Sequence, residues 1–482
     1  MLMMSYMTSD VRSNQLGEFT TAPLPYLTAS LPGVGGLIKQ QPGDFLVEEL
    51  PLYEPSGEGE HLYLLIEKQG QTTMQVIDPL ARLFGVRRND IGYAGLKDKH
   101  AVTRQYLSIY RPGAESEDQR LLEQIDSMPF TLIRASRHRN KLRRGHLAGN
   151  RFEIRIRQCA PDAPPGAPPR EPPNAPPSAP PSSPNVVLPE DVLARAGAVV
   201  ESLLTHGVPN YLGEQRFGNR RNNHIIGRLL LLEQWPEALD EFLGRPQAHE
   251  NPGVRQARSA YDEGDYSEAL AHWPRHLRHE RRLLEALNRG KDARQAIRSM
   301  DANQSRFFIN SLQGAIFNQV LARRITDAGP EEASAGDVPG IDRLVDGDVA
   351  SKQDSSAVFI VDVATAALEN APDGRIAAQL ISPTGPMWGP KMVQATGAPG
   401  KAEAQVLSAF GLEASDVIEK RMMAGQGERR PLRIVMKSAE VSPGDDERGP
   451  YLRVDLQLSR GCFATAVLRE IMKNDSPAAG DE

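Results

Sequence analysis

The sequence predicts an α+β protein of two domains. At 482 residues the chain is long enough for two domains, because single hydrophobic cores stop growing near roughly 250–300 residues. Strand patterns dominate both ends of the chain, whereas helical spacing of apolar residues dominates the region from about 218 to 424. Two domains of different character therefore account for the chain.

The expected strands share alternating or β-branched and aromatic residues. They begin at or cover residues 45–47, 61–67, 102–110, 151–157 and 451–458. The expected helices share apolar residues three and four positions apart. They cover residues 72–86, 189–206, 224–243, 259–296, 303–324 and 463–473. Pro79 lies in the first helix and should kink it or move its start, since an interior proline costs about 3 kcal/mol. Residues 381–386 are rich in Pro and Gly and are expected to form a turn.

Composition excludes several classes of protein. No apolar run approaches the roughly 18–20 residues of a membrane span. Residues 1–30 lack the basic and apolar regions of a signal peptide, so a cytoplasmic protein is expected. Cys159 and Cys462 are too few for a disulfide framework and have no metal-ligand spacing. A formal net charge of −6 argues against a protein that binds polyanions over its whole surface.

The segment from Arg134 to Arg157 is the most basic part of the chain. It carries nine Lys or Arg residues against the single acidic Glu153. Such a concentration of one charge is expected where a protein binds the RNA backbone. It is equally typical of a solvated charged hairpin, and the two interpretations stay open at this point.

The residues around Asp98 favour a turn that presents a charged carboxylate. Asp98 lies between Lys97 and Lys99, after Gly95 and just before the strand at 102–110. Neighbouring ammonium groups lower the pKa of a carboxyl and oppose the effect of burial. Glycine allows a positive φ or a close approach to a ligand. By itself this pattern is also typical of a solvated surface turn.

At these residues the chain resembles a known family. The pattern Gly95-x-Lys97-Asp98-x-x-Ala101-x-Thr103-x-Gln105 is similar to the signature of the TruD family of tRNA pseudouridine synthases. Other segments resemble the family's motifs in the same order along the chain: Gly36–Glu49, Gly149–Phe152, Asn210–Gly218 and Gly461–Thr465. The departures from the family pattern are Leu212 in place of Phe, Cys462 in place of Ser and Phe463 in place of Tyr.

The resemblance assigns roles to individual residues. It implies that Asp98 is the catalytic residue. It also implies that the substrate is bound or the site organised by five further residues: Lys39, Lys97, Asn150, Phe152 and Arg216. Without it, Lys39 would be a solvated lysine at a strand end and Phe152 a core aromatic, because Phe152 alternates with apolar neighbours in its strand. Arg216 would bind either a phosphate or a backbone carbonyl.

The resemblance also implies a domain arrangement. The catalytic domain, with an antiparallel or mixed sheet plus helices, is expected to be discontinuous and to cover residues 31–217 and 425–475. An inserted α/β domain, 218–424, would face it across the tRNA. Residues 1–30 and 476–482 are expected to be tails. A proline-rich stretch at 160–187 is expected to be a disordered loop within the catalytic domain.

The implied activity is an isomerisation of uridine to pseudouridine in tRNA, at U13 of the D-arm, by a monomer that needs neither cofactor nor metal. In agreement with this, the sequence has no phosphate-binding Gly-Lys-Thr loop, dinucleotide fingerprint or metal-ligand cluster. The base would be flipped out, and Asp98 would act at the C1′ side of its ribose, by attack or by removing the C2′ proton. A non-catalytic RNA-binding or chaperone protein is the alternative, and a nucleoside hydrolase that releases the base is a third possibility.

Overall fold

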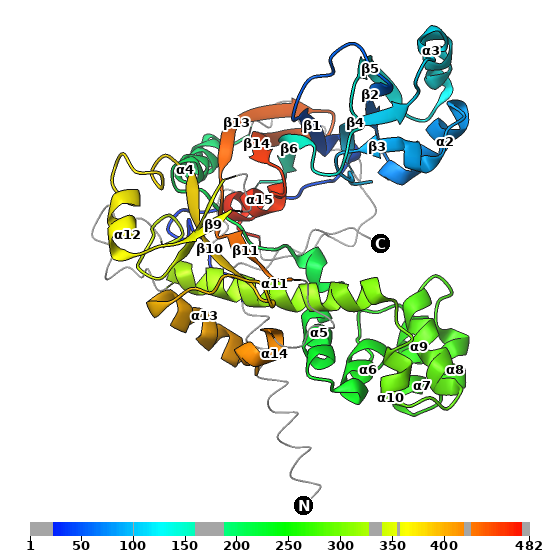
Figure 1. The fold of residues 1–482 in the computed structure, drawn as a ribbon, viewed down its shortest axis with the longest axis vertical. Coiled ribbons are helices and arrows are strands. Elements are labelled where there is room, and N and C mark those ends of the chain that lie inside the picture. Colours follow the sequence, from blue (N-terminus) through cyan, green and yellow to red (C-terminus); the bar gives the residue numbers. More distant parts are fainter. Residues whose placement is uncertain are drawn as a thin grey trace, which may run out of the picture. The chain divides into compact units, whose positions relative to one another are not determined.

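The computed structural model describes residues 23–99, 101–159, 188–326, 340–353, 357–418 and 426–474. The chain forms two compact units, and each contains both helices and strands (Figure 1). The first, called the sheet unit, is Tyr26–Pro209 with Arg433–Glu482. The second, called the helical unit, is Met1–Pro25 with Asn210–Leu432. The α+β class that the sequence predicts is confirmed.

The boundaries between the units differ from the expected ones. The helical unit begins at residue 210 and ends at residue 432, rather than at 218 and 424. The proline-rich stretch at 160–187 and the segment 476–482 lie outside the described residues. No helix within the described part of the chain is both long and apolar enough to cross a membrane.

The sheet unit is organised around an eight-stranded sheet. Its strands are β1 (Phe45–Pro51), β2 (His61–Lys68), β3 (Ile91–Tyr93), β4 (Val102–Tyr110), β5 (Thr131–His138), β6 (Leu147–Arg157), β13 (Met436–Asp446) and β14 (Gly449–Ser459). They follow the order β13-β14-β6-β1-β4-β2-β5, with β3 paired to β4. β1 and β4 are parallel, while β1 is antiparallel to β6 and β2 is antiparallel to β4. The sheet is therefore mixed, and the C-terminal hairpin β13–β14 extends it beside β6.

Four helices pack with this sheet: α2 (Thr73–Leu83), α3 (Glu115–Leu122), α4 (Glu190–His206) and α15 (Ala464–Met472). The alternation in β6 buries Phe152, Ile154 and Ile156 in one core cluster with residues of α4 and α15. A second cluster joins β2 and β4 to α2. Burying an aliphatic or aromatic side chain of this size contributes about 1.5–3 kcal/mol, and the strand registers place the sheet residues of both clusters on one face. Both clusters therefore hold the helices against the same face of the sheet. Two short strands, β7 (Val208–Pro209) and β12 (Arg433–Ile434), also pair with each other.

Local signals in the sequence explain where α2 begins and where α4 ends. Thr72 caps α2, and its hydroxyl accepts a hydrogen bond from the Gln75 amide at 3.2 Å. Pro79 lies inside α2 without moving its start, so that part of the expectation is wrong. Helix α4 ends at Gly207, whose φ of 86° is a conformation that glycine adopts without strain.

The expected N-terminal tail is shorter than residues 1–30. Residues 1–22 lie outside the described part of the chain, but Thr28 is buried, with 3% of its surface exposed. Its amide and hydroxyl donate hydrogen bonds to Glu470 of α15, at 3.0 and 2.7 Å. The expectation of a tail is therefore wrong for this part, because a buried carboxylate distant in the sequence fixes it.

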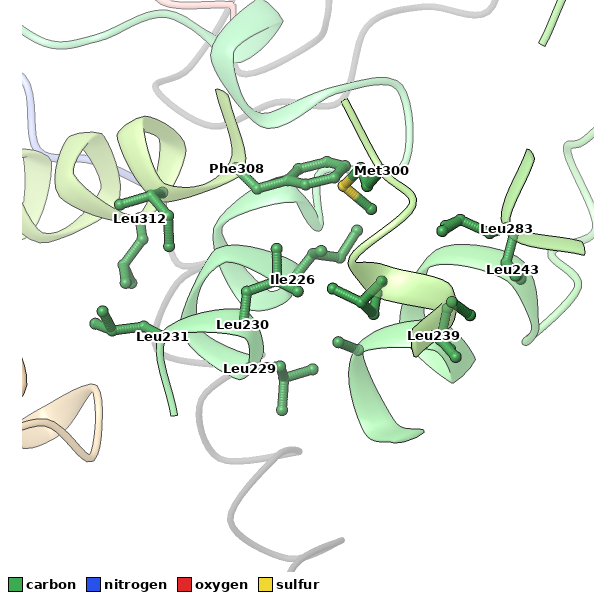
Figure 2. Close-up of a cluster of buried hydrophobic side chains, with 14 of the residues drawn as sticks. Ile226, Leu229, Leu230, Leu231, Leu239, Leu243, Leu283, Met300, Phe308 and Leu312 are labelled. Atoms are coloured by element: carbon green, nitrogen blue, oxygen red, sulfur yellow. The ribbon is translucent and has the colours of Figure 1, made fainter. Parts of the chain in front are cut away.

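The helical unit contains ten helices within its described residues. They are α5 (Asn223–Leu231), α6 (Trp235–Leu243), α7 (Pro252–Asp262), α8 (Tyr266–His272), α9 (Arg278–Asn288), α10 (Ala293–Ile297), α11 (Ala302–Thr326), α12 (Val363–Glu369), α13 (Gly397–Ala409) and α14 (Ala414–Ile418). Its four-stranded sheet has the order β11-β10-β8-β9. These strands are β8 (Val349–Lys352), β9 (Val358–Ile360), β10 (Ile381–Met387) and β11 (Glu428–Pro431). Figure 2 shows part of the main core of this unit, where Phe308 and Leu312 of α11 lie near Ile226 and Leu230 of α5.

Three expected elements of the helical unit are wrong. The single helix expected at 224–243 is split into α5 and α6, because Pro236 in the first turn of α6 has no amide hydrogen to continue a helix. The helix expected at 259–296 is divided among α7, α8, α9 and α10, and both Gly264 and Gly290 adopt a positive φ at the breaks. The turn expected at 381–386 is strand β10, which is buried throughout and pairs with β8 and β11. Tertiary pairing there overrides the local preference of proline for turns.

An ion-pair network around the buried Arg157 connects three parts of the sheet unit. The Arg157 guanidinium lies 2.7 Å from an oxygen of Asp44 and 2.6 Å from an oxygen of Asp446. The hydrogen bond from Arg157 lowers the pKa of Asp446 to about 2. The three residues come from the turn before β1, from β6 and from the C-terminal hairpin, so the network joins distant parts of the chain.

We expect Asp446→Asn to destabilise the sheet unit by about 1 kcal/mol at neutral pH, because solvent screens a partly exposed pair. The pKa of Asp446 is depressed from 3.8 to about 2 in the folded protein, so this stabilisation is complete above pH 3.8 and is lost as the pH falls towards 2. Urea unfolding at a series of pH values measures the difference between wild type and variant. Asp445→Asn is the matched control, because Asp445 has no ion pair among the described residues. A difference that persists unchanged at pH 2 would contradict the assignment.

Candidate active site

Asp98 lies on the turn that connects β3 to β4. Its carboxylate is 39% exposed, and the Nζ atom of Lys39 lies 2.9 Å from its Oδ2 atom. Lys39 is 21% exposed and has a φ of 57°, which costs a non-glycine residue roughly 1–2 kcal/mol. An ammonium at this distance favours the ionised carboxylate. The turn thus presents the Asp98 carboxylate to solvent with the Lys39 ammonium beside it.

The position of Lys97 differs from the expected one. Its side chain is 6% exposed, and its Nζ lies 3.1 Å from Glu49 Oε2 and 2.7 Å from Asn150 Oδ1. Glu49 and Asn150 are opposite each other in the β1–β6 ladder, so one ammonium reaches both. Burial raises the pKa of Glu49, and the charge of Lys97 opposes that rise. The expectation that Lys97 flanks the Asp98 carboxylate is therefore wrong, and Lys97 instead holds the turn to the sheet.

Phe152 packs against Phe45, whose ring lies under the Lys39 ammonium. Its ring is 7% exposed and meets the Phe45 ring edge-on, with 6.2 Å between the ring centroids. Lys39 Nζ lies 5.0 Å from the centroid of Phe45. Phe152 is thus mainly a core residue, as its alternation alone indicates. Stacking on a uridine would require part of this ring to be uncovered.

The structure brings together five of the six predicted site residues. Asp98, Lys39, Lys97, Asn150 and Phe152 all belong to the sheet unit. The sixth, Arg216, belongs to the helical unit.

Arg216 is half-buried, and burial lowers the pKa of its guanidinium. The Ser311 hydroxyl and the Asn223 side-chain amide donate to the Arg216 carbonyl. The backbone of Arg216 is therefore fixed within the helical unit.

Two charged residues near the turn were missed by the sequence analysis. Glu49 continues the buried face of β1 formed by Phe45 and Val47, and Lys68 continues the buried face of β2. Each therefore has a charge at an inward position of an alternating strand. That pattern is a usable signal, because Lys and Glu are almost never fully buried without a partner.

Most of the basic segment is neutralised within the protein. Ion pairs engage six of its nine cations: Arg134, Arg137, Arg139, Arg151, Arg155 and Arg157. The other three, Lys141, Arg143 and Arg144, lie in the loop between β5 and β6 and have no carboxylate partner among the described residues. The expectation that the whole segment from Arg134 to Arg157 binds the RNA backbone is therefore too broad. Within this segment, the cations available to phosphates are concentrated in the loop.

The same loop lies against the start of the turn that carries Asp98. Arg144 donates a hydrogen bond of 2.8 Å to the Tyr93 hydroxyl at the end of β3. The Gly145 amide donates to the Ala94 carbonyl at 2.8 Å. Any phosphate held by the loop would therefore be close to the turn that carries Asp98. No group of His, Cys, Asp or Glu suited to hold a metal ion is present in the described part of the chain.

The fold matches a solved structure. A crystal structure assigned to tRNA pseudouridine synthase D (TruD) from Methanosarcina mazei matches with a TM-score of 0.76 and 27% sequence identity, covering 94% of this chain and 97% of that chain. The mixed sheet and its helices are thus those of the pseudouridine synthase fold, and the chain is an isomerase of this class.

Sequence relatives define the family more closely. The family model of tRNA pseudouridine synthase D (TruD) matches residues 23–168 and 185–471. A tRNA pseudouridine synthase D from Geobacter sulfurreducens is 37% identical over 455 residues, which are 94% of this chain and 98% of the relative. One from Thermus thermophilus is 33% identical over 450 residues, which are 93% of this chain and 92% of the relative. The chain belongs to the TruD family, and the resemblance carried by its motifs is confirmed.

We expect Lys97→Met to destabilise the sheet unit by about 3–5 kcal/mol, because it leaves the Glu49 carboxylate buried without its cation. Adding Glu49→Gln should recover part of this loss, since the double variant has no buried unpaired charge. A double-mutant cycle by urea unfolding measures the coupling. Additive effects of the two single substitutions would show that the pair is not coupled.

Proposed function

We propose that this protein converts uridine to pseudouridine in tRNA, at U13 of the D-arm, with Asp98 as the catalytic residue. The observation that carries the proposal is the exposed Asp98 carboxylate, paired with Lys39 at 2.9 Å on a turn of a TruD-family fold. We further propose that it acts as a monomer in the cytoplasm and without a cofactor. A cofactor is not needed, because the reaction exchanges one glycosidic bond for another with no net oxidation or reduction.

The chemistry requires a base that has left the RNA stack. The N1–C1′ bond breaks, the uracil rotates, and C5 bonds to C1′; C5 then loses its proton to solvent and N1 gains one. Asp98 can serve this reaction in two ways. It can attack C1′ and hold the sugar while the base turns, or it can remove the C2′ proton and later return it. Both routes need an ionised carboxylate next to the ribose of a flipped nucleotide.

The surroundings of Asp98 suit these requirements. Lys39 supplies positive charge beside the carboxylate, where a phosphate of the flipped nucleotide would also be attracted. The hydrogen bond from Lys97 to Asn150 holds the turn to the sheet, and Phe152 packs against Phe45. The loop cations Lys141, Arg143 and Arg144 provide charge for the tRNA backbone.

We expect Asp98→Asn to bind tRNA with wild-type affinity and to form no pseudouridine, because the amide keeps the shape but cannot act as nucleophile or base. Purified protein is incubated with an unmodified tRNA transcript, and carbodiimide-sensitive positions are mapped. Asp78→Asn is the matched control, since Asp78 is 32% exposed and paired with Arg88 at 2.6 Å in the same unit. Wild-type modification by Asp98→Asn would refute the catalytic assignment.

Two other outcomes of this experiment would overturn the proposed activity. Release of free uracil by the wild-type protein would indicate a nucleoside hydrolase. Tight tRNA binding with no product at any position, by the wild-type protein, would indicate a non-catalytic RNA-binding protein.

We expect Arg143→Gln with Arg144→Gln to raise the Kd for tRNA, because both guanidinium groups can reach phosphates. The slope of log Kd against log salt should fall by about 0.7–0.9 for each phosphate that the variant no longer neutralises. Arg139→Gln is the control from the same segment, because Arg139 is exposed but paired with Glu58. Filter binding over a salt series measures both quantities. Equal effects of the double variant and the control would place the tRNA elsewhere.

A further inference from the structure

The backbone of the catalytic turn is fixed at three consecutive residues. The Lys97 amide donates to the Thr73 hydroxyl at 3.1 Å. The Asp98 carbonyl accepts a hydrogen bond from Lys68 Nζ at 3.1 Å. The Lys99 carbonyl accepts one from the Gly70 amide at 3.1 Å. All three partners come from the short segment Lys68–Thr73, which leads from the end of β2 into α2.

Lys68 is the buried residue at the start of this segment. It is 1% exposed, and both of its hydrogen-bond acceptors are backbone carbonyls, those of Gln71 at 2.6 Å and Asp98 at 3.1 Å. Burial lowers the pKa of Lys68 to about 8, and the negative charge of Asp98 opposes this effect. A buried ammonium is costly to keep. Lys68 is therefore not a surface charge. Its amine connects the β2–α2 loop at Gln71 to the turn at Asp98.

Thr73 continues the same arrangement. Its hydroxyl accepts from Lys97 and donates to the buried Gln105 side chain at 3.0 Å. Gln105 lies in β4, directly after the catalytic turn. The segment thus connects the turn to β2 and β4, which pair with each other in the sheet.

We propose that the segment Lys68–Thr73, through Lys68 and Thr73, is a brace that positions Asp98 for the reaction. The proposal rests on the proposed function in that Asp98 is taken as the catalytic residue. Neither Lys68 nor Thr73 touches the substrate, and both act through the backbone of the turn. The need for such a brace is physical: the Asp98 side chain is partly exposed, so its place depends on its backbone. A misplacement of about 1 Å in an active site can cost about a hundredfold in rate.

The first test uses Lys68→Met in the full-length protein. We expect the single-turnover rate of pseudouridine formation to fall about a hundredfold, with the Kd for tRNA unchanged. Lys473→Met is the matched control. Lys473 is also buried in the sheet unit, and its amine also donates to two backbone carbonyls, those of Thr28 and Leu31, but it is not bonded to the turn. A wild-type rate for Lys68→Met, or a change in Kd with the rate intact, would overturn the proposal.

A second pair of variants decides the question if Lys68→Met does not fold. Thr73→Val keeps the shape but removes the hydroxyl, and we expect it to lose rate without loss of tRNA binding. Thr73→Ser restores the hydroxyl and is expected to restore the rate. If Thr73→Val reacts as fast as wild type, the brace does not position Asp98.

Hydrogen exchange gives a readout independent of activity. We expect the amides of the turn at 95–99 to exchange faster in Lys68→Met and Thr73→Val than in wild type, whereas Lys473→Met should leave them unchanged. Unchanged exchange in both brace variants would overturn the proposal. An inactive wild-type protein would overturn the proposed function, while faster exchange in the variants would still establish the brace as structural.

Discussion

The ion pair between Lys39 and Asp98 is the interaction on which the candidate site depends. The two residues come from opposite sides of β1 in the sequence, and the sheet brings their charged atoms to 2.9 Å. A partly exposed pair of this kind contributes about 0–1 kcal/mol to stability. The left-handed backbone of Lys39 costs roughly the same or more. The pair therefore contributes little net stability, and its value in the proposed function is to place an ammonium beside the Asp98 carboxylate.

Two ion-pair networks fix the backbone of the sheet unit around this pair. Beneath the turn, Lys97 connects it to Glu49 and Asn150 across the β1–β6 ladder. At the edge, Arg157 connects the turn before β1 to the C-terminal hairpin through Asp44 and Asp446. The Lys97–Glu49 pair is buried, so removing one of its partners costs more than the pair contributes, whereas Asp446 of the second network is partly exposed. Such networks fix geometry at the expense of tolerance to mutation.

The strands of this sheet come from distant parts of the chain. Strands β13 and β14 are separated from β6 in the sequence by Asn210–Leu432 of the helical unit, yet they complete the sheet beside β6. The sheet that carries Asp98 is therefore finished only when the C-terminal residues have been added.

Much of the fold around Asp98 could be predicted from the sequence. The Asp98 turn, the strands at 102–110 and 451–458 and the long helix α11 follow from local patterns, and the structure has them. Contacts between distant residues could not be predicted locally. The partner of Asp98 is Lys39, 59 positions away, and the carboxylates that pair with Arg151 and Arg157 include Asp455 and Asp446, about three hundred positions further on. The sequence therefore could not show that most cations of the segment from Arg134 to Arg157 form ion pairs within the protein. The breaks between α5 and α6 and between α7 and α8 had local signals, Pro236 and Gly264, that the apolar periodicity outweighed.

The proposed function requires the Asp98 carboxylate to isomerise one uridine of tRNA. The most direct measurement is the map of pseudouridine in tRNA from cells that lack this protein, complemented with the wild-type chain or with Asp98→Asn. We expect pseudouridine at position 13 to disappear without the protein, to return with the wild-type chain and to stay absent with Asp98→Asn. Pseudouridine at position 13 in the cells that lack the protein, or its return with Asp98→Asn, would contradict the proposed function.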